Sequence, residues 1–215
     1  VLAVPSPGEQ PLYISSGTWS LMGTEREEAD CSEQSRQNNF TSEGGMGYRF
    51  RYLKNIMGLW MIQSVKKELT EDLSFGEICA LAAEESISSI VDCNDESFMA
   101  PKSMTLAVQD YCSRTGQQVP ETTGEIAAVI YNSLAKCYAD TLAQLERMIG
   151  KYYDTVYVVG GGSKAGYLNE LTAKYTGRRV SAGPTEATAI GNVTVQMLSD
   201  GIFPDLDAAR ACIRE

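Results

Sequence analysis

The sequence predicts one α/β domain built around a mixed β-sheet. Two strand–turn–strand patterns occupy the first part of the chain, a long amphipathic helix lies in the middle, and strands alternate with helices after residue 150. Hairpins give antiparallel strands and strand–helix–strand units give parallel ones, so a sheet that joins both is mixed. The 215 residues are 43% apolar, which is enough to fill one sizeable core.

Two predicted hairpins supply the first strands. The first joins Leu12–Ser15 to Trp19–Met22 through a turn at residues 16–18, and the second joins residues 39–43 to 48–53 across the glycine-rich residues 44–47. Between the hairpins, residues 24–38 carry many acidic side chains and almost no apolar ones. We therefore expect an exposed loop there.

In the middle of the chain, apolar periodicity and capping residues predict helices. The expected segments are residues 55–69, a helix opening at Ser74, residues 104–114 and residues 122–148. Thr122 and Glu125 have the spacing of a capping box, as do Ser74 and Glu77. The last helix is the most strongly indicated, because its apolar residues return to one face throughout its length.

Strand and helix alternate in the last third of the sequence. The β-branched run Thr155–Val159 predicts a buried strand, which leads into three glycines and a helix over residues 163–175. A strand over Arg179–Ala182 and a helix from residues 184–186 to Gly201 follow.

Composition excludes several classes of function. The chain has 28 acidic and 18 basic residues and a net charge of −10, which argues against a nucleic-acid or anionic-membrane surface. It has no histidine, so Ser-His-Asp triads, Cys-His dyads and histidine-ligated zinc are excluded. The six cysteines form no C-x-x-C pair, and apolar runs such as residues 56–62 are too short to span a bilayer, so we expect free thiols in a cytoplasmic protein.

Two glycine loops are candidates for phosphate or nucleotide contact. At the tip of the first hairpin, Gly17 lets the backbone approach a phosphate and Thr18 offers N–H and O–H donors; the alternative is an ordinary hairpin turn. At the second loop, Gly160–Gly162 leave no side chain between the backbone and a ligand; the alternative is close strand–helix packing. A dinucleotide fingerprint also fits G-x-G-x-x-A, but the next strand ends in Ser181-Ala182-Gly183 and not in the acidic residue that would hold a ribose, and no P-loop is present.

Two amides and two tryptophans complete the candidates. Asn55 and Gln63 are eight residues apart in the expected helix over residues 55–69, so they share one face. They are either ligand contacts or caps and surface amides. Trp19 and Trp60 are expected in the core.

Several of these segments together resemble a known family. The strings are YISSGTWSLMG (residues 13–23), LKNIMGLW (53–60) followed by Gln63, VGGG (159–162) and AGPTEA (182–187). They resemble the FGGY family of carbohydrate kinases, and within it the rhamnulokinase branch. The first two strings are specific to that branch, whereas the triple glycine is shared by the whole family.

The resemblance implies an actin-like, ribonuclease H-like ATPase domain that is the second of two lobes closing over ATP, Mg²⁺ and a sugar. By analogy, Gly17 and Thr18 meet the γ-phosphate, Gly161 lies against the adenosine, Gln63 holds the nucleotide and Asn55 reaches the sugar. Relatives often carry an asparagine just after the triple glycine, where this chain has Ser163-Lys164-Ala165.

The family's catalytic aspartate has no counterpart in these residues. The resemblance places that general base, the first phosphate loop and the N-terminal domain upstream of Val1, so this chain is expected to be an inactive ATP-binding half of a ketose kinase. L-rhamnulose is the expected substrate and L-fuculose the alternative. The alternative hypotheses are a non-catalytic nucleotide- or sugar-binding module and a dinucleotide-dependent enzyme.

Overall fold

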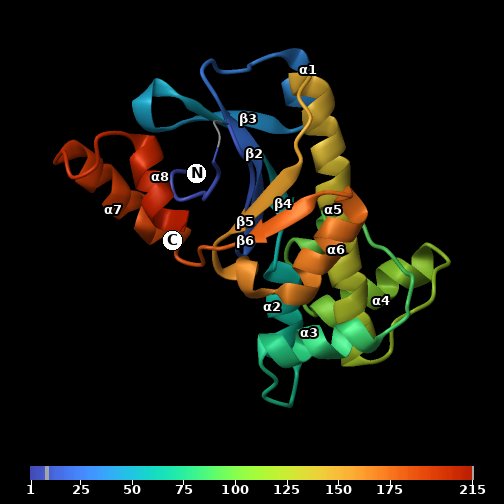
Figure 1. Cartoon of the computed structure of the whole chain (residues 1–215). Coiled ribbons are helices and arrows are strands. Elements are labelled where there is room, and N and C mark those ends of the chain that lie inside the picture. The colour runs from blue at the N-terminus through green and yellow to red at the C-terminus, as the bar shows by residue number, and fades with distance from the viewer. Residues whose placement is uncertain (8–9, 215) are drawn as a thin grey trace.

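A six-stranded mixed sheet forms the centre of the computed structural model, which describes residues 1–7 and 10–214 (Figure 1). The strand order is β3-β4-β2-β1-β5-β6. In chain order the strands are β1 (Leu12–Ser16), β2 (Trp19–Arg26), β3 (Phe40–Gly44), β4 (Phe50–Met57), β5 (Thr155–Val159) and β6 (Arg179–Ala182). β1 pairs antiparallel with β2 and parallel with β5, which confirms the predicted mixed sheet.

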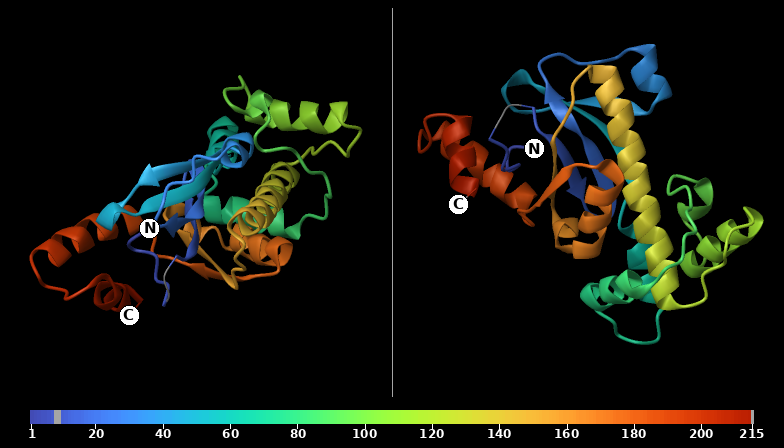
Figure 2. Two further views of the ribbon diagram at one scale, coloured as in Figure 1. Left: turned by 90° about the horizontal axis from the view of Figure 1, so that it is seen from above. Right: turned by 45° about the vertical axis from the view of Figure 1, so that its right-hand side comes forward.

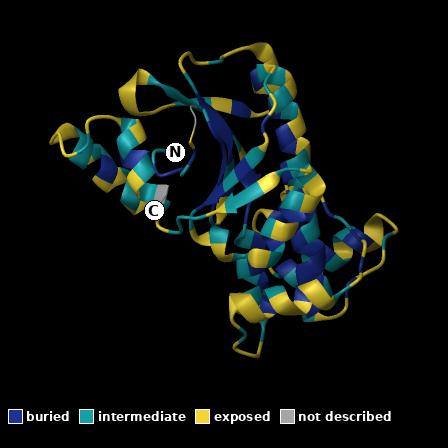
Figure 3. Cartoon of the chain, in the orientation of Figure 1, coloured by how far each residue is buried: buried dark blue, intermediate teal, exposed yellow. Residues whose placement is uncertain are grey.

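The helix α5 (Thr123–Ile149) covers one face of this sheet (Figures 1 and 3). Thr122 and Glu125 form the predicted capping box, and Gly150 ends the helix in the left-handed conformation. The Ser20 hydroxyl of β2 lies 2.6 Å from the Tyr138 hydroxyl of α5, and both side chains are buried. This contact satisfies two polar groups inside the core that joins helix and sheet.

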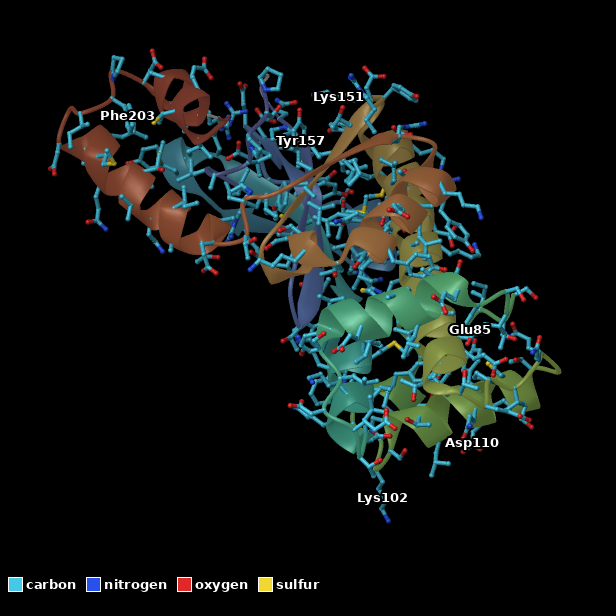
Figure 4. All side chains as sticks on the ribbon, turned by 60° about the horizontal axis from the view of Figure 1, so that its bottom comes forward. Glu85, Lys102, Asp110, Lys151, Tyr157 and Phe203 are labelled. Atoms are coloured by element: carbon cyan, nitrogen blue, oxygen red, sulfur yellow. The ribbon has the colours of Figure 1, made fainter. Side chains whose placement is uncertain are left out.

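Three further helices pack around the first half of α5 and extend to one end of the molecule. They are α2 (Trp60–Glu68), α3 (Phe75–Glu84) and α4 (Met104–Arg114), and η2 (Glu96–Phe98) precedes α4. Ser74 and Glu77 cap α3 as predicted, and the bounds of α4 match the predicted residues 104–114. Figure 4 shows Lys102 and Asp110 projecting from the outer end of this helical group.

The C-terminal elements divide between the two faces of the sheet. The short η3 (Gly161–Lys164) and α6 (Gly166–Thr176) lie on the α5 side, whereas α7 (Ala187–Ser199) and α8 (Leu206–Arg214) lie across the sheet from α5 (Figures 1 and 2). Phe203, in the connection between α7 and α8, is at the opposite end of the molecule from Lys102 (Figure 4). The chain's first residues pack beside α8, where Val4, Tyr13 and Val159 form a small second core.

The prediction of a helix over residues 55–69 was wrong at its beginning. Residues 55–57 belong to β4, and α2 begins only at Trp60. Leu53, Ile56 and Trp60 have helical spacing, but β4 pairs with β2 on one side and β3 on the other. Backbone pairing with two neighbouring strands overrides a local periodicity of this kind.

Other predicted boundaries also require correction. Residues 24–38 are not one exposed loop: β2 continues to Arg26, and the short α1 spans Glu33–Gln37. The predicted helix over residues 163–175 begins at Gly166, after η3, and α8 was not predicted. Within the second hairpin, β3 and β4 are separated by η1 (Met46–Tyr48).

All six cysteines are present as free thiols. In the described part of the chain, no helix combines the length and the apolar character needed to cross a membrane.

Candidate functional site

The tip of the β1–β2 hairpin is attached to the beginning of α2. The backbone N–H of Leu59 donates to the Gly17 carbonyl and that of Trp60 to the Thr18 carbonyl, both at 3.0 Å. Gly58 permits this approach, because a Cβ there would lie 2.6 Å from the carbonyl carbon of Trp19. Donors at the start of a helix normally lack partners, so these bonds both satisfy α2 and fix the tip in place.

The side chains of Thr18 and Gln63 meet at this junction. The Thr18 hydroxyl donates to Oε1 of Gln63 at 3.2 Å. Thr18 is exposed, and Gln63 is half-buried and lines a cavity. Gln63 therefore orients the hydroxyl that the sequence singled out.

The three glycines after β5 have different reasons to lack a side chain. Gly160 has φ of 88°, and a Cβ there would lie 2.8 Å from the Ser16 carbonyl oxygen. A Cβ on Gly162 would collide with the Ser16 hydroxyl. At Gly161 nothing lies within 4 Å of the Cβ position, and φ is not positive. Packing against β1 thus explains Gly160 and Gly162, while Gly161 opens onto free space.

Two cavities adjoin at Gly17 and Gly161, which line both. The first, here called the helix cavity, has a volume of about 710 Å³ and lies among α2, α3, α5 and α6. Its lining is largely apolar and aromatic and includes Leu59, Ile62, Phe75, Ala80, Tyr131 and Tyr167. A cavity of this size and character suits a flat heterocycle with a sugar attached.

Aromatic packing shapes the inner wall of the helix cavity. The rings of Tyr131 and Tyr167 meet edge to face with centroids 6.0 Å apart, and the Cys79 thiol donates to the Tyr131 hydroxyl at 3.2 Å. Burial raises the pKa of Tyr131, and the neighbouring Cys79 raises it further. The phenol is therefore neutral at physiological pH and contributes shape and hydrogen bonding rather than charge.

The second cavity, here called the sheet cavity, has a volume of about 690 Å³. It lies over the face of the sheet opposite α5, because Leu21 lines it whereas the neighbouring Ser20 points to Tyr138 of α5. Part of its lining is one cross-strand row: Ser15 of β1 pairs with Leu21 of β2, which pairs with Asn55 of β4. Residues directly opposite one another in neighbouring strands point to the same face. Asn55 thus enters the site from a strand.

The segment before α7 forms the facing wall of the sheet cavity. Gly160 N–H donates to the Pro184 carbonyl at 3.0 Å, which holds Thr185 and Glu186 beside the triple-glycine loop. Among the described residues that line this cavity, Glu186 has the one charged side chain. Within the described residues, no three His, Cys, Asp or Glu side chains gather into a possible metal site. Mg²⁺ in nucleotide sites is usually held by one or two carboxylates together with the phosphates, so Glu186 is the lining residue that could contribute a ligand.

The structure brings most of the sequence-predicted residues together, with two corrections. Gly17 and Gly161 line both cavities, Gln63 lines the helix cavity, and Thr18, which lines neither, is hydrogen-bonded to Gln63. Asn55 lies in the sheet cavity and Gln63 in the helix cavity, so the expectation that they share one helix face was wrong. Asn55 is on a strand, and the side chains of a strand alternate between its faces.

The other correction concerns Trp19. It was expected in the core, but it is 49% exposed and lines the sheet cavity, whereas Trp60 packs against the core as expected. Its position directly after a turn that itself lines the cavity was the signal that could have identified it. Glu186 was also missed as a site residue, because a polar residue before a helix normally signals only an N-terminal boundary.

Solved structures identify the fold. The chain is similar to a glycerol kinase from Plasmodium falciparum solved with ADP, at a TM-score of 0.70 and 11% identity, covering 99% of this chain and 43% of that one. It is also similar to a gluconate kinase from Lactobacillus acidophilus, at a TM-score of 0.68 and 10% identity, covering 97% of this chain and 43% of that one. The fold is therefore the actin-like ATPase domain of sugar kinases, as predicted.

Sequence comparison then gives the family. Residues 12–199 match the model of the FGGY family of carbohydrate kinases, C-terminal domain, and this chain belongs to that family. It is 45% identical over 214 residues to a rhamnulokinase of Oceanobacillus iheyensis and 44% identical over 213 residues to one of Halalkalibacterium halodurans. The matches cover 100% and 99% of this chain but 45% of each relative, so the chain spans less than half of their length.

Proposed function

We propose that this chain is the ATP-binding half of a kinase that transfers the γ-phosphoryl group of ATP to a ketose. The substrate we propose is L-rhamnulose, converted to L-rhamnulose 1-phosphate in the cytoplasm. The first support is the set of relatives named rhamnulokinase, which match this chain from end to end. L-fuculose remains the alternative sugar.

The observation that carries the proposal is the boundary formed by Gly17 and Gly161. It joins the helix cavity, which has the aromatic walls Phe75, Tyr131 and Tyr167 together with the polar Gln63, Lys164 and Glu170, to the sheet cavity, whose lining is mainly serine, threonine, asparagine and glycine beside Trp19 and Leu21. Neither Gly17 nor Gly161 puts a side chain across the boundary. A nucleotide has the same division, since its base is flat and apolar and its phosphates are polar. We place the adenosine in the helix cavity and the phosphates over Gly17 and Gly161, pointing toward the sheet cavity.

Each candidate residue then has a role. Thr18 donates to the γ-phosphate, where negative charge must be stabilised during transfer. Without nucleotide, Gln63 accepts the single hydroxyl proton of Thr18 at 3.2 Å. In this proposal the γ-phosphate replaces Gln63 as the acceptor when ATP binds, and the freed Gln63 amide contacts the nucleotide. Asn55 hydrogen-bonds the sugar from the floor of the sheet cavity.

The remaining requirements fall to a second, N-terminal lobe in our proposal. Transfer needs a base for the sugar hydroxyl. Among the described residues, Glu186 is the one carboxylate that lines the sheet cavity, and we assign the base instead to the aspartate that the family resemblance places in the other lobe. Mg²⁺ neutralises phosphate charge in such reactions, but the described residues do not gather ligands for it. In this proposal residues 1–215 are a single nucleotide-binding domain, and the other lobe brings the base and completes the metal's surroundings.

The test uses the complete kinase that contains this chain. A coupled ADP-release assay with L-rhamnulose, L-fuculose and D-xylulose is expected to show the highest kcat/KM for L-rhamnulose. Calorimetry with ADP, NAD and NADP separates the rival classes, and we expect heat of binding with ADP alone. Phosphorylation of none of the ketoses, or binding of a dinucleotide in preference to ADP, would contradict the proposal.

A further inference from the structure

Trp19 is placed unlike a residue that serves only the fold. Its side chain is 49% exposed at the first position of β2, and its indole makes no hydrogen bond within the described residues. Trp60, by contrast, donates its indole N–H to the Phe98 carbonyl at 3.3 Å and packs against the core. A half-exposed indole in a cavity wall has a large apolar face that remains available for a ligand.

The neighbours of Trp19 show what kind of ligand that face suits. Trp19 and Leu21 are two residues apart on β2, so they point to the same face, and both line the sheet cavity. Ser15 and Asn55 flank Leu21 in the same cross-strand row. An apolar strip therefore lies directly beside a hydroxyl and an amide on one surface.

A surface of this kind matches a deoxy sugar. Sugars present hydroxyls that need hydrogen-bonding partners together with C–H groups that gain from leaving water. In a 6-deoxyketose the C6 end is a methyl group, so one end of the molecule is wholly apolar. Its hydroxyls suit Ser15 and Asn55, and its methyl end suits the indole.

We propose that Trp19 determines specificity for the deoxy end of the sugar, packing its indole against the C6 methyl group of the ketose. This inference rests on the proposed function and goes beyond it, since it concerns the choice between sugars and not the phosphoryl transfer itself. Stacking on adenine is not the role of Trp19, because Trp19 lines the sheet cavity and not the helix cavity.

The kinetic test compares two ketoses that differ at a single group. L-rhamnulose is 6-deoxy-L-fructose, so L-fructose differs from it only by a hydroxyl at C6. In the complete kinase, Trp19→Ala is expected to lower kcat/KM about tenfold or more for L-rhamnulose and less than threefold for L-fructose, since one apolar group in a pocket contributes on the order of 10- to 200-fold. Trp19→Phe is expected to retain most of the preference, and KM for ATP is expected to stay unchanged in both.

The matched control is Trp60→Phe, which removes an indole outside both cavities and is expected to leave the ratio between the sugars unchanged. The same variant makes Trp19 the only tryptophan of this chain. For this measurement, any tryptophan in the other lobe of the complete kinase is also replaced. The fluorescence emission of Trp19 is then expected to shift to shorter wavelength with L-rhamnulose and not with ADP.

The outcomes separate the two proposals. If the wild-type kinase phosphorylates L-rhamnulose but Trp19→Ala lowers kcat/KM equally for both sugars, the inference about Trp19 is overturned and the proposed function stands. A shift of Trp19 emission by ADP alone would likewise overturn it in favour of a nucleotide contact. If the wild-type kinase phosphorylates no ketose, the proposed function fails, and this inference fails with it.

Discussion

The three glycines in the loop after β5 lack a side chain for different physical reasons. Ser16 of β1 occupies the space that side chains at Gly160 and Gly162 would need, whereas the space beside Gly161 is open to both cavities. The pattern G-G-G identifies a loop without side chains, but it does not say which glycine serves packing and which serves a ligand. Their contacts make that distinction testable.

We predict that Gly161→Val weakens ATP binding without destabilising the domain. A branched side chain would stand where the proposed nucleotide crosses between the cavities, so KM for ATP should rise at least tenfold, while KM for the sugar changes little. Gly162→Ala is the matched comparison: its methyl group would collide with Ser16 and should lower the free energy of unfolding by about 1–3 kcal/mol. Steady-state kinetics and urea unfolding measure the two effects. Loss of folding in Gly161→Val would show that this glycine also serves packing.

Thr18 supplies the second prediction at this scale. In the complete kinase, Thr18→Val should lower kcat roughly tenfold to a thousandfold, because a donor aimed at the transferred phosphoryl group contributes ~2–4 kcal/mol in the transition state. Thr18 is exposed, so the melting temperature should stay unchanged. Thr18→Ser keeps the hydroxyl and should recover most of the activity. A near-normal kcat in Thr18→Val would show that the hairpin tip is an ordinary turn without a role in phosphoryl transfer.

At the scale of elements, one ion pair attaches α8 to the sheet. Arg210 of α8 lies 3.2 Å from Glu25 of β2, and their side chains are only 4% and 7% exposed. Arg210 also donates to the Leu2 carbonyl at 3.4 Å, so the start of the chain, α8 and β2 meet at this residue. Glu25 was expected in an exposed acidic loop, and it is buried because α8 supplies a cation for it.

We predict that Arg210→Met lowers the free energy of unfolding by about 3–5 kcal/mol, because it leaves the Glu25 carboxylate buried without its partner. The double variant Glu25→Met with Arg210→Met should be markedly more stable than the single one, because no buried charge is left alone. Urea unfolding of this 215-residue chain measures both. Lys136→Met is the control: it breaks the exposed pair with Asp140 and should cost less than about 1 kcal/mol. If Lys136→Met and Arg210→Met lowered the free energy of unfolding by similar amounts, burial would not explain the importance of the Arg210–Glu25 pair.

At the scale of the molecule, the proposed site lies where segments distant in sequence meet. The hairpin tip at residues 16–18, the start of α2 near Leu59 and the loop after β5 come together because β1 pairs with both β2 and β5. The helix cavity opens on the α5 side of this junction and the sheet cavity on the other. Sheet topology thus allows one continuous path for a nucleotide past Gly17 and Gly161.

We predict that this chain alone folds cooperatively but does not phosphorylate L-rhamnulose. The core around α5 is continuous and buried, so a single unfolding transition is expected. A positioned base and a metal site each contribute orders of magnitude to such a reaction. In our proposal both depend on the other lobe, because the described residues place one carboxylate, Glu186, in the sheet cavity and no group of three metal-ligating side chains. A coupled ADP-release assay checks the activity, and circular dichroism during urea titration checks the folding. Sugar-dependent turnover by this chain would show that the base lies within it.

The sequence by itself determined the local features of this protein. The capping boxes at Ser74 and Thr122 depend on contacts within a few residues, which the order of amino acids records directly. The β-branched run Thr155–Val159 likewise indicated its strand from its own residues. The motifs also indicated the family, and the comparisons confirmed it.

Only the tertiary structure decided where side chains lie relative to segments far along the chain. Asn55 belongs to a strand because Leu21 of β2 pairs with it, and Glu25 is buried because Arg210 reaches it. Trp19 faces a cavity because β2 presents alternate residues to opposite faces. Local periodicity cannot record such partners, since each lies tens of residues away or more, and pairing and burial outweigh local preference wherever the two disagree.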